Sequence, residues 1–233
     1  MKDYAKEFRE DLVEFRKITN DFYNGKVSVA EYKSFSGGFG SYAQRGGSLG
    51  MLRLRLPGGR ISKDSLRFIA DSIEKYHIDR LHLTTCQTVQ LHNLKPDAIC
   101  SLAEEAWAHG IITRGGGGDY PRNVMMSPLS GVDKREPFDL TGYVSAASEY
   151  LLGFIKTVKL PRKLKVAFSG SSENFPHATF RDLGFVAKEN QTFDVYCAGG
   201  LGIQPKMGIL AAEDAAPEMI LYYIKAMVDT FTS

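Results

Sequence analysis

The sequence predicts an α+β protein in which a split βαβ half domain is followed by part of a second, mixed α/β domain. Two segments, 51–56 and 81–92, alternate apolar and polar residues with the two-residue period of a strand. Each is followed by a segment whose apolar residues recur at helical spacing. The second half of the chain carries three strand patterns and a closing helical pattern, which are too few strands for a complete sheet domain.

The first predicted elements follow one another from the N-terminus. Residues 1–35 are expected to form an amphipathic helical leader, and the glycines of the next segment, "SGGFGSYAQRGGSLG", favour a loop. The segment "MLRLRL" is expected to be a strand that ends at Pro57-Gly58-Gly59. The helix after it has Ser62 as its candidate N-cap, because a serine side chain can accept a hydrogen bond from the first helical turn.

The next elements complete the half domain. The segment "LHLTTCQTVQLH", residues 81–92, is predicted to be one strand with apolar residues at most odd positions and polar residues at even ones. A second helix, with apolar residues at helical spacing between 99 and 106, ends at Gly110. The extended segment that follows is expected to supply a further strand, and a strand, helix, strand, helix and strand in this order are typical of ferredoxin-like units. Residues 36–135 are therefore predicted to form a ferredoxin-like half domain.

Residues 136–233 are predicted to be the first part of the second domain. A helix from about Thr141 to Lys156 leads into three strand candidates, "LKVAFSG", "LGFVAKE" and "TFDVYCAGG". The closing helix has an apolar face that contains Ile220, Ile224, Met227 and Phe231.

Composition excludes several classes of protein. The net charge of the 233-residue chain is only +2, so a surface that tracks nucleic-acid phosphates is not expected over the whole molecule. No apolar run approaches the roughly 20 residues that cross a bilayer, and the charged N-terminus lacks the pattern of a signal peptide. A cytoplasmic protein without a membrane partner is expected. Three widely spaced cysteines, Cys86, Cys100 and Cys197, give neither a disulfide framework nor a CxxC metal pair.

Cations and hydrogen-bonding side chains share one face of several predicted strands. Arg53 and Arg55 alternate with leucines in "MLRLRL", and Lys163 and Lys165 alternate with apolar residues in "RKLKVAFS". Arg122 follows a glycine-rich turn. If these faces converge, they form a cationic site for a polyanion or a small oxyanion. The alternative is an ordinary solvated sheet face, since antiparallel sheets often face water. No phosphate-binding glycine motif occurs in the sequence.

Six short motifs, in this order, resemble the siroheme-containing sulfite and nitrite reductases. They are "RLRLPGG", "LTTCQTVQLH", "YPRNV…SPLSGVD", "LPRKLKVAFSG", "RDLGFVA" and "AGGLG", and they extend from about Arg53 to Gly202. The resemblance implies a ferredoxin-like half domain followed by the start of a domain that holds siroheme and a 4Fe-4S cluster. It also implies the six-electron reduction of sulfite to sulfide, or of nitrite to ammonia.

The resemblance assigns roles to ten residues. The residues that would meet the substrate anion are Arg55, Arg122, Lys163 and Lys165. The residues that would lie against siroheme are Arg53, His82, Thr84, Gln90, Asn123 and Arg162. A lysine at the position of Lys165 favours sulfite over nitrite within the family, so sulfite is the expected substrate.

The chain departs from the family pattern in two respects. His82 and Cys86 stand where arginines are usual, and a cysteine scarcely donates a hydrogen bond. The cluster needs four thiolates, whereas the chain has three cysteines, none at the family's spacing. The chain is therefore expected to hold no metal itself and to be the N-terminal half of such a reductase. The missing C-terminal half or a second subunit would supply the cluster ligands, and a donor such as ferredoxin would supply the electrons.

Two other interpretations stay open from the sequence. The chain could be a siroheme- or tetrapyrrole-binding protein without catalytic activity, which the replacements at His82 and Cys86 allow. The less favoured alternative is an RNA-binding module. Aromatic residues do not alternate with the cations on the strands, as base-stacking surfaces require, so no nucleic-acid partner is expected.

Overall fold

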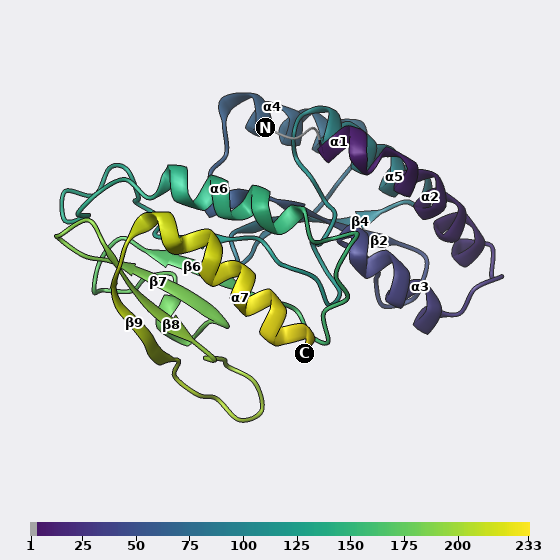
Figure 1. Cartoon of the computed structure of the whole chain (residues 1–233). Helices are drawn as coiled ribbons and strands as arrows, with labels where there is room; N and C mark the ends of the chain where they lie inside the picture. The colour runs from purple at the N-terminus through teal and green to yellow at the C-terminus, as the bar shows by residue number, and fades with distance from the viewer. Residues whose placement is uncertain (1–3) are drawn as a thin grey trace. The chain divides into compact units, whose positions relative to one another are not determined.

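The computed structural model in Figure 1 describes residues 4–233 in two units. The first unit runs to Leu56 and continues from Arg60 to Tyr120, whereas the second contains Pro57–Gly59 and Pro121–Ser233. Residues 1–3 of the predicted helical leader lie outside the described residues. No helix among residues 4–233 combines the length and the apolar character needed to cross a membrane.

A four-stranded antiparallel sheet forms the centre of the first unit, in the order β1-β2-β4-β3. Its strands are β1 (Ser41–Ala43), β2 (Gly50–Arg55), β3 (Leu81–Leu83) and β4 (Thr88–Leu94). Strand β1 lies in the segment that the sequence analysis predicted to be a loop. Its three residues pair with β2, but they have no strand-like sequence pattern by which they could be predicted. The apolar face of the sheet is fully enclosed at Leu52, Leu54, Val89 and Leu91.

Five helices belong to the first unit. They are α1 (Tyr4–Glu7), α2 (Arg9–Tyr23), α3 (Val29–Ser36), α4 (Lys63–Lys75) and α5 (Pro96–Ala108). Helix α5 packs on β2, and α2 packs on both α5 and α3. The predicted N-cap at Ser62 is confirmed, because its side chain accepts a hydrogen bond from the backbone N–H of Ser65 at 3.0 Å.

The prediction of one continuous strand over residues 81–92 is wrong, because a tight turn divides the segment into the β3–β4 hairpin. The N–H of Thr84 donates to the carbonyl of Thr88 at 3.0 Å, and the two threonine hydroxyls lie 2.7 Å apart. Gln87 takes a positive φ of 57°, which closes the turn. Thr84 and Cys86 therefore lie in the turn, whereas His82 and Gln90 lie opposite each other on the two strands.

A five-stranded mixed sheet forms the second unit, with strands β5 to β9 in sequence order. They are β5 (Met125–Met126), β6 (Val166–Ser169), β7 (Leu183–Ala187), β8 (Phe193–Cys197) and β9 (Ile209–Ala215). The pairs β5–β6 and β6–β7 are parallel, and the pairs β7–β8 and β8–β9 are antiparallel. The sequence analysis did not predict β9, since its sequence "ILAAEDA" does not alternate and its residues are largely exposed.

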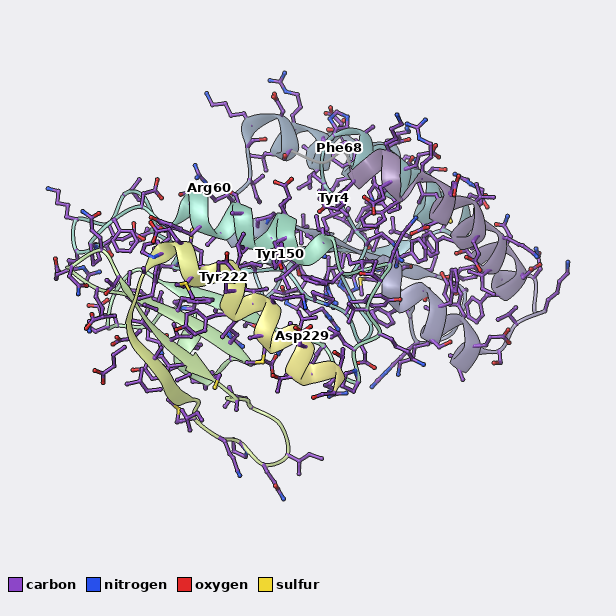
Figure 2. The ribbon with its side chains drawn as sticks, in the orientation of Figure 1. Tyr4, Arg60, Phe68, Tyr150, Tyr222 and Asp229 are labelled. Atoms are coloured by element: carbon purple, nitrogen blue, oxygen red, sulfur yellow. The ribbon has the colours of Figure 1, made fainter. Side chains whose placement is uncertain are left out.

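Helices α6 (Thr141–Leu152) and α7 (Ile220–Thr232) share one core with this sheet. In Figure 1 the yellow α7 lies across the green strands. The predicted apolar face of α7 is confirmed, with Ile220 and Ile224 buried and Met227 and Phe231 packed against the core. Tyr222 and Asp229 lie on the exposed side of the helix (Figure 2). Helix α6 ends four residues before the predicted Lys156, with Gly153 as its C-cap.

Short 3-10 helices occupy four further segments of the described chain. They are Gly37–Phe39, Pro57–Gly59, Ala178–Phe180 and Pro217–Met219. The segment Pro57–Gly59 belongs to the second unit, where the N–H of Gly58 donates to the carbonyl of Val124 at 2.9 Å.

Candidate functional site

Five of the ten predicted site residues lie in each unit, and each group is described within its own unit. The first unit contains Arg53, Arg55, His82, Thr84 and Gln90. The second unit contains Arg122, Asn123, Arg162, Lys163 and Lys165.

The two arginines of β2 are held by backbone carbonyls of one loop. Nη1 of Arg53 donates to the carbonyl of Gly116 at 2.6 Å, and Nη1 of Arg55 donates to the carbonyl of Arg114 at 2.8 Å. Arg55 is 4% exposed, and burial lowers the pKa of Arg53 below that of an exposed arginine. Both guanidinium groups are therefore fixed, partly desolvated cations, and such cations attract oxyanions more strongly than solvated ones do.

A chain of polar side chains extends from Arg53 across the polar face of the sheet. With the Gln90 amide turned so that its oxygen faces β2, Nη2 and Nε of Arg53 donate to that oxygen at 2.6 and 3.1 Å. The Gln90 nitrogen then lies 3.1 Å from Nε2 of His92. On the other side of the imidazole, Nδ1 lies 3.2 Å from the side-chain nitrogen of Gln44, whose oxygen accepts from the N–H of Asn93 at 2.7 Å.

This chain of five groups contains one hydrogen-bond acceptor too few. Arg53 and the Asn93 N–H are donors at its two ends, each glutamine offers one oxygen, and a neutral imidazole accepts at only one nitrogen. When Gln90 turns its oxygen toward Arg53, both ring nitrogens of His92 face amide N–H groups. When it turns the oxygen toward His92, its nitrogen faces Arg53 instead. An oxygen from a bound anion would supply the missing acceptor.

Burial and the positive charges near its ring favour a neutral His92. Burial lowers its pKa first, and the nearby His82, Arg80 and Arg53 lower that pKa further. The ring of His82 is exposed and its centroid lies 6.3 Å from that of His92. His82 is thus positioned at the polar face, whereas the hydroxyl of Thr84 is engaged with Thr88 inside the turn.

A basic hollow lies beside the start of β6 in the second unit. It has a volume of about 190 Å³ and is lined by Arg162, Lys163, Lys165, Phe180, Arg181, Asp182 and the segment Gly199–Gly202. Four cations therefore surround one carboxylate. Three of the four residues in Gly199–Gly202 are glycines and carry no side chain, whereas Leu201 and Phe180 supply apolar surface.

Asp182 connects this hollow to the backbone of the lysine segment. One of its carboxylate oxygens accepts from the N–H of Lys165 at 2.7 Å. Burial raises the pKa of Asp182, although that hydrogen bond and the charges of Lys165 and Arg181 act in the opposite direction. The sequence analysis did not select Asp182, Arg181 or the glycines as site residues, although both motifs that contain them, "RDLGFVA" and "AGGLG", had been singled out.

Arg122 and Asn123 run alongside the same segment. Pro121 pairs in parallel with Leu164, and the N–H of Arg122 donates to the carbonyl of Leu164 at 2.8 Å. Asn123 is 2% exposed. The backbone of the second unit therefore brings Arg122 next to the segment that carries Lys163 and Lys165.

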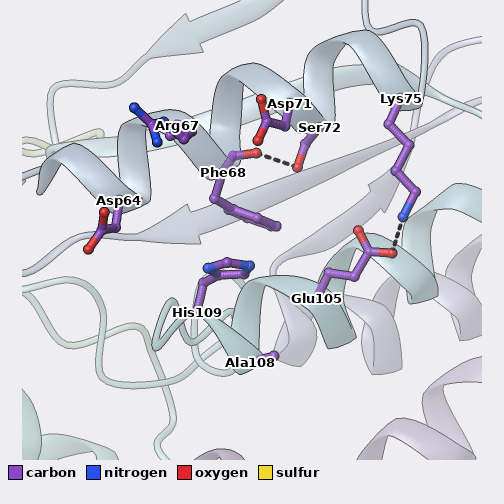
Figure 3. Close-up of a pocket in the computed structure, with 9 residues that line it drawn as sticks. All are labelled: Asp64, Arg67, Phe68, Asp71, Ser72, Lys75, Glu105, Ala108 and His109. Carbon is purple, nitrogen blue, oxygen red and sulfur yellow. Dashed lines mark hydrogen bonds and ion pairs between the residues drawn. The ribbon is translucent and has the colours of Figure 1, made fainter.

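A larger hollow of about 620 Å³ lies between α4 and α5 and contains none of the predicted site residues (Figure 3). Its floor includes the ring of Phe68, which stacks on His109 with 4.5 Å between centroids. At its edge Lys75 donates to Glu105 at 2.6 Å. Acidic and basic side chains alternate around it, so its charge selects neither anions nor cations.

The described residues contain no group of three or more histidine, cysteine or acidic side chains placed to hold a metal ion. Cys100 is buried, and Cys86 and Cys197 are partly buried. With three cysteines in the whole sequence, the chain cannot provide four thiolates to a cluster.

Comparison with known families matches this arrangement to a pair of domains. Residues 42–108 match the "Nitrite/Sulfite reductase ferredoxin-like half domain", and residues 117–233 match the "Nitrite and sulphite reductase 4Fe-4S domain". The chain belongs to the nitrite and sulphite reductase family. This confirms the resemblance inferred from the six motifs and the predicted α+β fold class.

Curated relatives include enzymes named for either substrate. The ferredoxin–nitrite reductase of Synechococcus elongatus is 31% identical over 157 residues, which cover 64% of this chain and 31% of that protein. The sulfite reductase (ferredoxin) 2 of Mycolicibacterium paratuberculosis is 27% identical over 161 residues, covering 67% of this chain and 29% of that protein. The chain thus spans about a third of the length of the curated relatives it matches.

Among solved structures, the Mycobacterium tuberculosis NirA protein has a similar fold. The TM-score is 0.81 at 21% identity, and the match covers 98% of this chain and 45% of that one. At this identity the likeness concerns the fold alone.

Proposed function

We propose that the chain forms part of a siroheme-dependent nitrite or sulfite reductase and supplies residues that bind anions. The observation that carries the proposal is the acceptor deficit on the polar face of the first unit, where the hydrogen bonds among Arg53, Gln90 and His92 lack one acceptor oxygen. A carboxylate of a tetrapyrrole is an oxygen acceptor of this kind. The four cations around the hollow of the second unit support the same chemistry.

The proposed roles of the residues follow the resemblance. Side chains that would hold the siroheme carboxylates are Arg53, His82, Thr84, Gln90, Asn123 and Arg162. Side chains that would bind sulfite or nitrite are Arg55, Arg122, Lys163 and Lys165. Bound siroheme and its cluster would pass the six electrons from the donor to the anion. The lysines would donate hydrogen bonds to the anion and offset its charge, and their ammonium groups can pass protons to its oxygens.

The proposal includes a second polypeptide segment outside these 233 residues. Three cysteines cannot ligate a 4Fe-4S cluster, so the cluster thiolates would come from a C-terminal half or from another subunit. Several curated relatives are named as ferredoxin-dependent, which supports ferredoxin as the electron donor. Sulfite is the preferred substrate in this proposal because Lys165 keeps a cation where nitrite reductases tend to have an amide.

The proposed domains are a helical leader over residues 1–35, a ferredoxin-like half domain over 36–135, and the first part of the siroheme domain over 136–233. The two units of the fold divide instead at Tyr120 and Pro121. The boundaries at 35 and 135 concern which segments fold alone, and expression of each segment with hydrogen-exchange measurements would test them.

Titration of the purified chain with siroheme, followed by visible absorption, tests the proposed function. We expect binding that weakens about tenfold in Arg53→Met and in the double variant Lys163→Ala/Lys165→Ala, the size expected for losing a charged hydrogen bond. Siroheme whose carboxylates have been esterified should bind to the wild type no more tightly than siroheme itself binds to the weakest variant. Arg67→Ala, an exposed cation on α4, is the matched control and should bind as the wild type does. Equal binding of siroheme and its ester would contradict the proposal.

A second candidate is a tetrapyrrole-binding protein without catalytic activity. The replacement of arginine by His82 and Cys86, at positions where the family usually has arginines, favours it. It predicts the same titration, but no sulfite or nitrite reduction after the missing half has been supplied together with reduced ferredoxin. Turnover in that mixture would exclude it.

A further inference from the structure

Arg114 is a buried cation in the first unit that takes no part in the proposed site. It is 7% exposed and follows directly on Thr113, whose hydroxyl accepts a hydrogen bond from Nε1 of Trp107 at 3.0 Å. Its carbonyl accepts from Arg55, and the carbonyl of Gly116, two residues later, accepts from Arg53. The segment that begins at Arg114 therefore sets where both arginines of β2 can lie.

The guanidinium of Arg114 is itself held from three sides. Nε donates to the Asp11 carboxylate at 3.1 Å, and Nη1 donates to the carbonyl of Gly38 at 2.8 Å. Aromatic rings surround it, with centroids 4.4 Å (Phe39), 5.5 Å (Tyr120) and 5.7 Å (Phe8) from its central carbon. Such a cage restricts a cation far more than a surface ion pair does.

The backbone repeats the same connection. The N–H of Gly115 also donates to the carbonyl of Gly38, at 2.8 Å, so this carbonyl accepts hydrogen bonds from both Arg114 and Gly115. A methyl group on Gly38 would lie 3.1 Å from Nη1 of Arg114, so a larger residue there would require the guanidinium to shift. Helix α2, through Asp11, and the 3-10 segment at Gly38 are thus both fastened to the loop that holds Arg53 and Arg55.

We propose that Arg114, anchored by Asp11, is a positioning residue that fixes Arg53 and Arg55 through the carbonyls of residues 114 and 116. The proposal rests on the proposed function only for what the two arginines bind. A substitution of Arg114 or Asp11 keeps both Arg53 and Arg55, but it lets their guanidinium groups move. A helix within the first 35 residues thereby takes part in anion binding without touching the anion.

The experiment measures the exchange of the guanidinium Nη–H protons of Arg53 and Arg55 by NMR in the full chain, because Nη1 of each arginine donates to the carbonyl of residue 116 or 114. In Arg114→Lys and in Asp11→Asn we expect the Arg53 and Arg55 protons to exchange about tenfold faster, the factor expected for weakening a charged hydrogen bond. Siroheme affinity should fall by a similar factor. Asp11→Asn removes the negative charge but keeps an oxygen acceptor. If Arg114→Lys does not fold, the exchange measured in Asp11→Asn tests the proposal.

Two control variants separate positioning from general destabilisation. Arg16→Gln removes an exposed ion pair between α2 and Glu104 of α5, 3.0 Å long, without touching the loop. Ile69→Val lowers stability in the core on α4. Neither should accelerate exchange at Arg53. Unchanged exchange at both arginines in a folded Asp11→Asn would overturn the proposal, whereas faster exchange without any siroheme binding to the wild type would keep it and reject the proposed function.

Discussion

Arg53 and Gln90 face each other across strands β2 and β4, and the guanidinium of Arg53 approaches the Gln90 amide to 2.6 Å. Because the amide must also meet His92, the chain of hydrogen bonds from Arg53 to the Asn93 N–H is one acceptor short. The change Gln90→Glu keeps nearly the same side-chain shape and supplies two acceptor oxygens. One can accept from Arg53 and the other from Nε2–H of His92. Gln44 can then donate to Nδ1, and every group in the chain is satisfied.

We therefore expect Gln90→Glu to raise the free energy of unfolding of the first unit by about 1 kcal/mol. Urea unfolding followed by the fluorescence of Trp107, the single tryptophan, measures it. The same variant should bind siroheme more weakly, since its carboxylate occupies Arg53. Gln90→Met, which leaves the Arg53 donors without that oxygen, should instead lower stability by about 1–3 kcal/mol. A destabilised Gln90→Glu would contradict the acceptor deficit.

The change Asp182→Asn should alter how the stability of the second unit depends on pH. Burial raises the pKa of Asp182 above its usual value of 3.8, so the folded protein binds this proton more tightly than the unfolded chain does. The stabilisation is complete below 3.8 and is lost as the pH rises through the raised pKa. The free energy of unfolding of the variant minus that of the wild type should therefore be more positive at pH 7 than at pH 3.

Hydrogen exchange of the β7 amides measures this difference, because β7 begins directly after Asp182. Asparagine keeps an oxygen that can accept from the N–H of Lys165, so the hydrogen bond itself is conserved. The opposite pH trend would mean that Lys165 and Arg181 outweigh burial at this carboxyl group.

Asp214 on β9 should titrate with a pKa of about 2. Nζ of Lys188 lies 2.9 Å from its carboxylate, and Asn190 and Thr192 donate to the same oxygen. Because this pKa lies below the usual value, the stabilisation is present above about pH 4 and is lost as the pH falls toward 2. In Lys188→Met the pKa should move toward its usual value.

NMR titration of the Asp214 carboxyl carbon in both proteins measures this change. Lys225→Met is the control, since it removes an exposed lysine that pairs with Asp229 on α7. An Asp214 pKa that is the same in Lys188→Met and the wild type would rule out the lysine as the main cause.

Gly40→Ala should destabilise the first unit more than Gly25→Ala does. Both glycines have positive φ, 76° and 74°, so an alanine at either costs about 1–2 kcal/mol in backbone strain. A methyl group at Gly40 would in addition lie 3.0 Å from the carbonyl oxygens of Arg53 and Thr113, whereas at Gly25 nothing lies within 4 Å. The difference between the two variants, measured by Trp107 fluorescence in urea, isolates the close approach of the two loops. Equal decreases in the free energy of unfolding would mean that the backbone around Gly40 moves to accommodate the methyl group at no extra cost.

Local sequence patterns predicted the elements whose residues obey a simple period. Helix α4 begins at the expected cap, Ser62, and the apolar face of α7 packs as its helical spacing indicates. The alternation in residues 81–92 did identify paired strands, but it continued through the turn at Thr84–Gln87 and so concealed the hairpin. Strands β1 and β9 were missed, since each is defined by its pairing with the adjacent strand, β2 or β8, and not by an alternating pattern in its own residues.

The candidate site was predictable only as a set of cations. Sequence spacing placed Arg53 and Gln90 on polar faces, yet it could not show that they meet across two strands or that His92 competes for the same amide. Asp182 and Arg114 were missed for a similar reason. Asp182 accepts from the backbone N–H of Lys165 and the carbonyl of Arg114 accepts from Arg55, and such contacts between distant segments leave no local signature in the sequence.

Because of the tripeptide Pro57–Gly59, the two units are not made of two separate stretches of sequence. The tripeptide is flanked by residues of the first unit, yet Gly58 is hydrogen-bonded to Val124 and a methyl group on it would meet Met126 at 2.8 Å. A fragment that starts at Pro121 would lose this strand-edge partner, and no single cut of the polypeptide separates the two units. A chimera that exchanges the second unit for that of a relative must therefore carry two grafts, the long C-terminal segment and these three residues.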